Sequence, residues 1–197
     1  QISVTYNVKD SADAAEIISA IEGADGEEER VYTNKKISAE IQIDEKNFRM
    51  ENGFSEYQFN FTDTKSVDAS KKDVKLGENQ ESAAEYYKNI AKKSENWGTN
   101  EDSDSTNSWI NNAFNFNTDA NYIFTFTYTD LAGNSTTYSP RYFTYDEIAP
   151  TGEITVTTDE GSTVWKDMLD VITFGIFSNS DTKISFSSKD ATSVYKQ

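Results

Sequence analysis

The chain has 197 residues, of which 34 are acidic and 18 basic, so its formal net charge is −16 at pH 7. That charge repels nucleic-acid phosphates and anionic lipids, and no apolar run approaches the ~20 residues that span a bilayer. We therefore expect neither nucleic-acid binding nor membrane insertion. Histidine and cysteine are absent, which excludes disulfides, zinc fingers and Ser-His-Asp triads. Aromatic residues make up 13% of the chain and predict a packed core.

The first third of the chain predicts short strands and one helix. Apolar and polar residues alternate over 2–8, 37–43 and 57–61, the period of half-buried strands. A helix is predicted over 11–22, capped by Asp10 or Ser11 and ended by Gly23. Its apolar stripe, at helical spacing, consists of Ala14, Ile17, Ile18 and Ile21.

A second helical segment is predicted over 79–97. Its stripe contains Ala83, Tyr86, Tyr87, Ile90, Ala91 and Ser94, and it ends before Gly98. Tyr86 and Tyr87 lie about 100° apart around a helix, so they cannot be equally buried. Packing onto a sheet is the alternative to a partner contact for Tyr87 and Ile90, and Tyr86 is the better candidate for a surface contact.

The polar stretch 98–108 is predicted to be a loop. Glu101, Asp102 and Asp104 crowd three carboxylates together, and hard oxygen ligands suit calcium. The segment lacks the EF-hand arrangement, and a solvated acidic loop is the simpler interpretation.

An aromatic β-hairpin is predicted over 121–145. Tyr122, Phe124, Phe126 and Tyr128 alternate with smaller residues before a turn at 130–134. A tyrosine two residues before a buried position is typical of the tyrosine corner of immunoglobulin-like sandwiches, although any aromatic hairpin has this pattern. For 1–148 we predict a mostly β fold, an antiparallel immunoglobulin-like sandwich with helical insertions near 11–22 and 79–97.

A module boundary is predicted near Pro150. Segments 154–157 and 183–185 resemble 2–5 and 36–38, so the repeated unit is one whole module. Because a sandwich needs about 100 residues, 149–197 is interpreted as the N-terminal part of a second immunoglobulin-like module, truncated or completed elsewhere.

Five segments of the chain carry a resemblance to a known family: 2–6, 39–48, 126–134, 143–151 and 165–175. In these segments the chain resembles the immunoglobulin-like repeats of large cell-surface proteins of gut Firmicutes. This resemblance implies an extracellular location, at the bacterial cell surface or secreted, with neighbouring modules of the same chain as partners. Some surface proteins of this kind bind host immunoglobulin as B-cell superantigens. A plain repeat would not carry both helices, and such additions are where a special function is grafted.

We therefore expect a non-enzymatic module that engages a host protein, such as immunoglobulin or another glycoprotein, through its aromatic helix. The chain shows no catalytic constellation or phosphate-binding loop, and no cofactor is expected beyond the weak calcium alternative. The candidate contact residues, of types common in interface hot spots, are Tyr86, Tyr87, Ile90, Trp97 and Trp109.

Two alternative functions stay open at this point. A structural stalk or spacer repeat would have no ligand of its own. A carbohydrate-binding module would stack sugars on Trp97, Trp109 or Trp165. Separately, a Lys36–Asn134 isopeptide bond would stabilise a cysteine-free module if the two residues lay on adjacent strands beside a buried acid.

Overall fold

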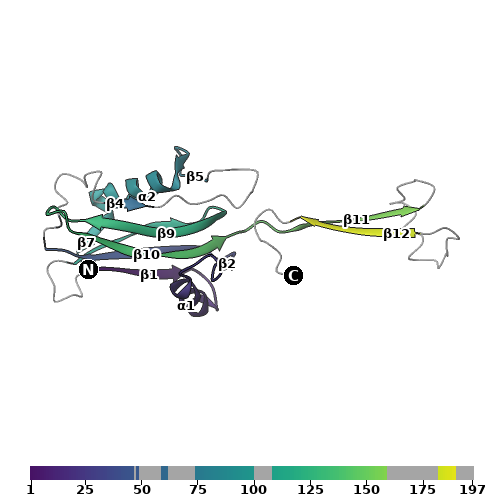
Figure 1. The fold of residues 1–197 in the computed structure, drawn as a ribbon, viewed down its shortest axis with the longest axis horizontal. Coiled ribbons are helices and arrows are strands. Elements are labelled where there is room, and N and C mark those ends of the chain that lie inside the picture. Colours follow the sequence, from purple (N-terminus) through teal and green to yellow (C-terminus); the bar gives the residue numbers. More distant parts are fainter. Residues whose placement is uncertain (47, 49–58, 62–73, 100–107, 159–181, 190–197) are drawn as a thin grey trace. The chain divides into compact units, whose positions relative to one another are not determined.

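The chain divides into two compact units, Gln1–Glu147 and Ile148–Gln197, a boundary one residue before the predicted one. A computed structural model describes residues 1–46, 48, 59–61, 74–99, 108–158 and 182–189. Its first unit holds both helices and two four-stranded sheets, and its second holds a two-stranded sheet (Figure 1).

The first unit is a β-sandwich. One sheet has the order β1 (Ile2–Val8), β3 (Ile37–Asp44), β8 (Ser108–Phe116) and β7 (Trp97–Thr99). The other has the order β2 (Val31–Thr33), β10 (Ser135–Tyr145), β9 (Ala120–Thr129) and β4 (Phe59–Phe61). Strands β2 and β10 are parallel, and the other neighbours in these sheets are antiparallel. The mostly β, antiparallel part of the predicted fold is confirmed.

The core lies between the sheets and is strongly aromatic. Every second residue of β9, from Ala120 to Tyr128, is buried, as the two-residue period of a strand requires. The opposite sheet contributes the alternating buried residues of β3. Phe124 of β9 lies 6.4 Å from the Tyr6 ring of β1 and 5.9 Å from the Phe114 ring of β8, so its ring joins the two sheets.

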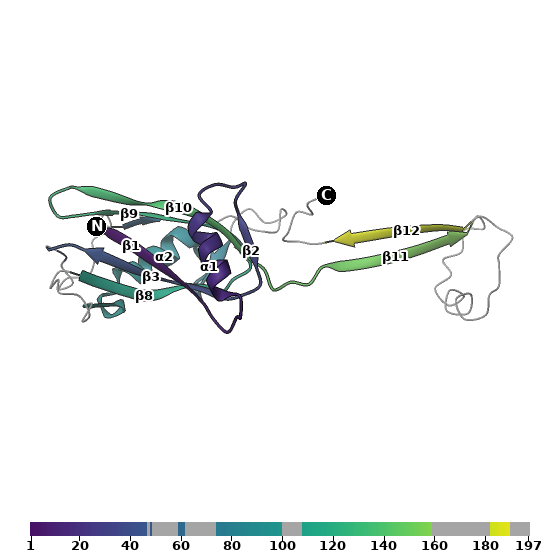
Figure 2. The ribbon, with the colours of Figure 1, turned by 90° about the horizontal axis from the view of Figure 1, so that it is seen from below.

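A helix covers each open edge of the sandwich, and Figure 1 shows the two on opposite sides of the strands. In Figure 2, which is seen from below, α1 is therefore the nearer helix and α2 the more distant one. Helix α1 (Ala14–Gly23) packs on β1, β2 and β10, and buries Ile21 completely. Helix α2 (Ala83–Lys92) packs on β4 and β8. A small hairpin, β5 (Lys75–Leu76) and β6 (Glu81–Ser82), precedes α2.

The helix boundaries differ from those that the sequence predicts. Helix α1 begins at Ala14 with Asp13 at its N-cap position, and Ser11 accepts a hydrogen bond from the Asp13 N–H instead of capping the helix. Helix α2 ends at Lys92 rather than at residue 97, because the 3₁₀ turn η1 (Ser94–Asn96) leads directly into strand β7. The predicted loop over 98–108 therefore begins with strand residues.

Strand β8 is the largest element that the alternation pattern does not reveal. Its sequence is rich in asparagine, a residue depleted in strands. The pairing with β3 shifts register between Ala39 and Ile41, which leaves an extra residue on β8. Within this irregularity the Asn111 side chain accepts a hydrogen bond from the Ala113 N–H, 2.9 Å away, so tertiary pairing and a local side-chain bond outweigh propensity.

The Tyr122 hydroxyl joins β9 to the chain segment before it. It donates to the Thr118 carbonyl oxygen at 2.7 Å and accepts from the Thr118 N–H at 3.3 Å. The Tyr122 side chain is buried, and its hydroxyl makes both bonds at the rim of the core, where they are only partly buried. The hydroxyl therefore fixes the entry into β9.

We expect Tyr122→Phe to lower the free energy of unfolding by about 1–3 kcal/mol, because it leaves the Thr118 backbone groups without these partners. Urea denaturation followed by circular dichroism measures this. Tyr32→Phe, at an exposed tyrosine of β2, is the control and should stay within about 0.5 kcal/mol of the wild type. Equal stability of the two variants would contradict this role.

Buried tyrosines make the fold sensitive to alkali. Burial raises the pKa of Tyr6, Tyr87 and Tyr122 above their ordinary value. A raised pKa in the folded state means that the folded protein holds its phenolic proton more tightly than the unfolded chain. This contribution to the free energy of unfolding is fully present below pH ~10, and it is lost as the pH rises through the folded-state pKa values.

Above pH ~10 each such tyrosine should lower the free energy of unfolding by up to ~1.4 kcal/mol per pH unit. Tyrosinate absorbance and circular dichroism, recorded together, test this. The buried tyrosines, whose pKa values are raised, should ionise only together with unfolding. Ionisation of all tyrosines near pH ~10 with native circular dichroism would contradict the expectation.

The second unit contains an antiparallel pair of strands, β11 (Thr151–Thr158) and β12 (Thr182–Lys189). The repeated segments 154–157 and 183–185 lie on these strands, and the segments they resemble lie on the antiparallel pair β1 and β3, apart from residue 36 just before β3. Phe186 is 77% exposed. A two-stranded sheet is only marginally stable alone. The segment 165–175 lies outside the described residues.

Candidate functional site

Two of the five candidate contact residues are parts of the core. Tyr87 is buried, lies 5.8 Å from the Phe114 ring and 5.3 Å from the Phe116 ring, and donates its hydroxyl to the Asn115 carbonyl. Trp97 is also buried, and its indole N–H donates to the Ala91 carbonyl at 2.8 Å. Their side chains hold α2 and β7 on the sandwich and are not offered to a partner.

The tryptophans do not form a surface platform within the described residues. Trp109 is half-buried and stacks on Phe48, with ring centres 5.2 Å apart, while Trp97 contacts the same ring edge-on. Trp165 lies outside the described residues. Trp97 is therefore not available as a stacking surface for sugars, which the tryptophan-based carbohydrate interpretation would need.

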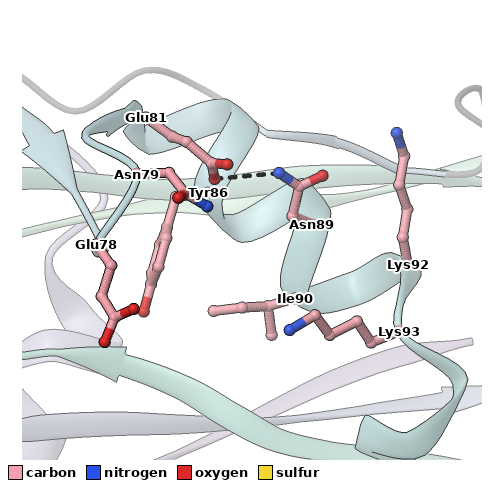
Figure 3. A pocket seen from close by; sticks show the side chains of 9 residues that line it. Glu78, Asn79, Glu81, Tyr86, Asn89, Ile90, Lys92 and Lys93 are labelled. Carbon is pink, nitrogen blue, oxygen red and sulfur yellow. Dashed lines mark hydrogen bonds between the residues drawn. The ribbon is translucent and has the colours of Figure 1, made fainter.

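The remaining two candidates, Tyr86 and Ile90, lie together in an open groove beside α2, here called the helix groove. Its volume is about 370 Å³. Lys92 and Lys93 lie at the end of α2. The other side chains that line the groove are Glu78, Asn79, Glu81, Tyr86, Asn89 and Ile90 (Figure 3).

Local sequence explains why α2 presents Tyr86 to this groove. Ser82 caps the helix by accepting a hydrogen bond from the Glu85 N–H at 3.3 Å. Ala83, Tyr87 and Ala91, spaced by one turn, form the buried face. Tyr86 is rotated by about 100° from Tyr87 and is half-buried; Figure 3 shows its side chain extending from α2 toward Glu78.

Two packing contacts hold the Tyr86 ring. It lies edge-on against the Tyr87 ring at 5.3 Å. It also packs closely on Gly77, whose φ of +69° and missing side chain allow this approach, since a Cβ at this position would lie 2.8 Å from the ring. The ring position is therefore largely fixed before any ligand arrives.

A second hollow of about 380 Å³ adjoins the same ring. Tyr86 of α2 lines it together with Leu76, Gly77 and Glu78. The residues around the end of β8 that also line it are Asn115, Asn117 and Thr118. Tyr86 thus lines both hollows. The first is rich in α2 side chains, and the second has amide side chains from the end of β8 and the residue after it.

The helix groove is electrically balanced in a strongly acidic chain. Glu78 and Glu81 face two lysines, Lys92 and Lys93. The Asn89 amide donates to a Glu81 carboxylate oxygen at 3.1 Å, which orients both side chains (Figure 3). The site therefore offers oriented hydrogen-bonding groups and does not select for a strongly charged ligand.

The structure gives little support to the other predicted sites. Glu101, Asp102 and Asp104, the calcium alternative, lie outside the described residues. Across the described ranges, no group of three or more His, Cys, Asp or Glu side chains is placed to hold a metal ion. Lys36 and Asn134 are both exposed, and the Asn134 amide donates to Asp130 within its own turn at 2.8 Å, an unfavourable setting for an isopeptide bond.

None of the helices in the described part of the chain has the length and apolar character needed to cross a membrane. Comparisons with family models, with curated proteins and with solved structures found no match to this chain.

Proposed function

We propose that this chain is a non-enzymatic binding module of an extracellular bacterial surface protein, and that it engages a host protein through the outer side of α2. The observation that carries the proposal is the helix groove. The inner face of α2 closes the sandwich edge, whereas Tyr86 and its polar neighbours on the other side line an open hollow.

The strand order supports an immunoglobulin-like framework for this module. Such sandwiches pair strands A, B, E and D in one sheet and C, F and G in the other. The sheet β1-β3-β8-β7 and the run β10-β9-β4 correspond to these two sets. The bonds from Tyr122 to the backbone four residues upstream also agree with a tyrosine corner.

In that framework both helices are insertions between framework strands. Helix α1 lies between β1 and β2, and α2 lies between β4 and β7 in the chain. Connections of this kind can lengthen without disturbing the sheets. The host partner comes from the resemblance to surface repeats, and immunoglobulin is the first protein to test.

The test is a pull-down of human serum and mucosal secretions on the immobilised chain, read by mass spectrometry. We expect one host protein to be enriched by the wild type and lost with Tyr86→Ala. Tyr32→Ala removes an equally large exposed ring from β2 and should retain capture. Tyr87 and Trp97 are unsuitable for this test because they are buried.

The rival function is a stalk that only projects other domains. The antiparallel pairing of β11 with β12, in segments that resemble those on β1 and β3, favours serial repetition of one module. If the folded wild type enriches no host protein, the binding proposal fails and the stalk becomes the better interpretation.

A further inference from the structure

We infer that the helix groove and the adjoining hollow bind a saccharide, so that the host protein is held through its glycan. This inference rests on the function proposed above and names the chemistry that α2 recognises. It is carried by one juxtaposition: a fixed tyrosine ring with amide side chains on both sides.

The polar groups around Tyr86 suit sugar hydroxyls. Each hydroxyl both donates and accepts hydrogen bonds, and a side-chain amide offers the same two functions. Asn79 and Asn89 line the helix groove, and Asn115 and Asn117 line the second hollow. A chain of sugar rings would meet such groups on both sides of Tyr86.

The Tyr86 ring suits the apolar face of a sugar. Aromatic rings carry a negative face that attracts C–H groups. Because contacts with Gly77 and Tyr87 hold this ring, little side-chain freedom is lost when a ligand packs against it. The ring borders both hollows, so a saccharide of two or more units would cross it.

The same residues fit a polypeptide surface less well. Protein interfaces concentrate Trp, Tyr, Arg and Met at their centre and deplete Lys and Glu. The helix groove has one aromatic side chain, Tyr86, among two glutamates, two lysines and two asparagines. Its volume, near the lower end of the ~300–1,000 Å³ of small-ligand sites, fits a short saccharide segment.

The test uses the full chain and fluorescently labelled N- and O-glycans released from human serum and mucin glycoproteins. Tyr86→Ala should weaken binding of the retained glycans by at least about tenfold. Tyr86→Phe keeps the ring and should stay within about threefold. Asn117→Ala, in the connection between β8 and β9, should weaken binding about three- to tenfold. Tyr32→Ala is the control and should bind like the wild type.

A second arm separates this inference from the proposed function. The host protein captured in the pull-down is enzymatically stripped of its glycans and offered again. Loss of capture supports the saccharide site. Undiminished capture overturns it and leaves the proposed function standing, with the polypeptide as the ligand. If the folded wild type binds neither glycans nor any host protein, both fail. Glycan binding that Tyr86→Ala leaves unchanged overturns the assignment to this groove.

Discussion

Replacing Arg30 with methionine should lower the free energy of unfolding by about 3 kcal/mol, although Arg30 lies in a connection and not in a strand. Only 2% of its side chain is exposed. One guanidinium nitrogen donates to the carbonyl oxygens of Tyr122 and Phe143, at 3.1 and 3.0 Å. Methionine fills much of the volume but cannot donate, and each buried carbonyl that loses a donor costs about 1–3 kcal/mol.

The ion pair of Arg30 with Glu27 should contribute much less. Its two nitrogen–oxygen distances are both 2.7 Å, but the Glu27 side chain is 67% exposed, so water replaces much of the interaction when the pair is broken. Glu27→Gln should therefore cost less than about 1 kcal/mol.

Urea denaturation of both variants measures the two losses in the free energy of unfolding. The comparison requires that the slope of this free energy against urea concentration is the same as in the wild type. A cost below about 1 kcal/mol for Arg30→Met would show that the two carbonyls do not depend on Arg30. A larger cost for Glu27→Gln than for Arg30→Met would show that the ion pair is the main contribution.

Replacing Phe124 with alanine should have the largest effect of all, about 3–5 kcal/mol. Its ring contacts both sheets and α2. Among the described residues the nearest ring is Phe116 at 5.0 Å, and Tyr87 of α2 lies 6.2 Å away. Removing the ring leaves a cavity enclosed by other aromatic residues, which cannot collapse to fill it because strand pairing holds their backbones.

Leu131→Ala, in the turn that follows β9, provides the comparison. Leu131 is 60% exposed, so this change should stay within about 0.5 kcal/mol. Thermal unfolding by calorimetry measures both variants. If Phe124→Ala proved no more costly than Leu131→Ala, the aromatic cluster would not be the core of the sandwich.

The sequence alone determined the parts of the fold that depend on local periodicity. The alternation in 121–129 predicts which side of β9 is buried, since successive residues of any strand face opposite sides. Helical spacing likewise separates Tyr86 from Tyr87, and the structure leaves the first half-buried and the second buried. The turn at 130–134 is also local, because Asp130 accepts from the N–H groups of Ala132 and Asn134.

Only the tertiary structure decided where distant segments meet. Strand β8 has an asparagine-rich sequence, and it is a strand because β3 and β7 pair with it. Tryptophan is common at protein interfaces, yet Trp97 is buried in the aromatic core. Arg30 is buried because two strand carbonyls, more than 90 residues away in the chain, need its donors. The amides of the second hollow come from the end of β8 and the residue just after it, and they line it with Tyr86 because α2 packs on β8. Such contacts depend on long-range pairing, which local periodicity does not encode.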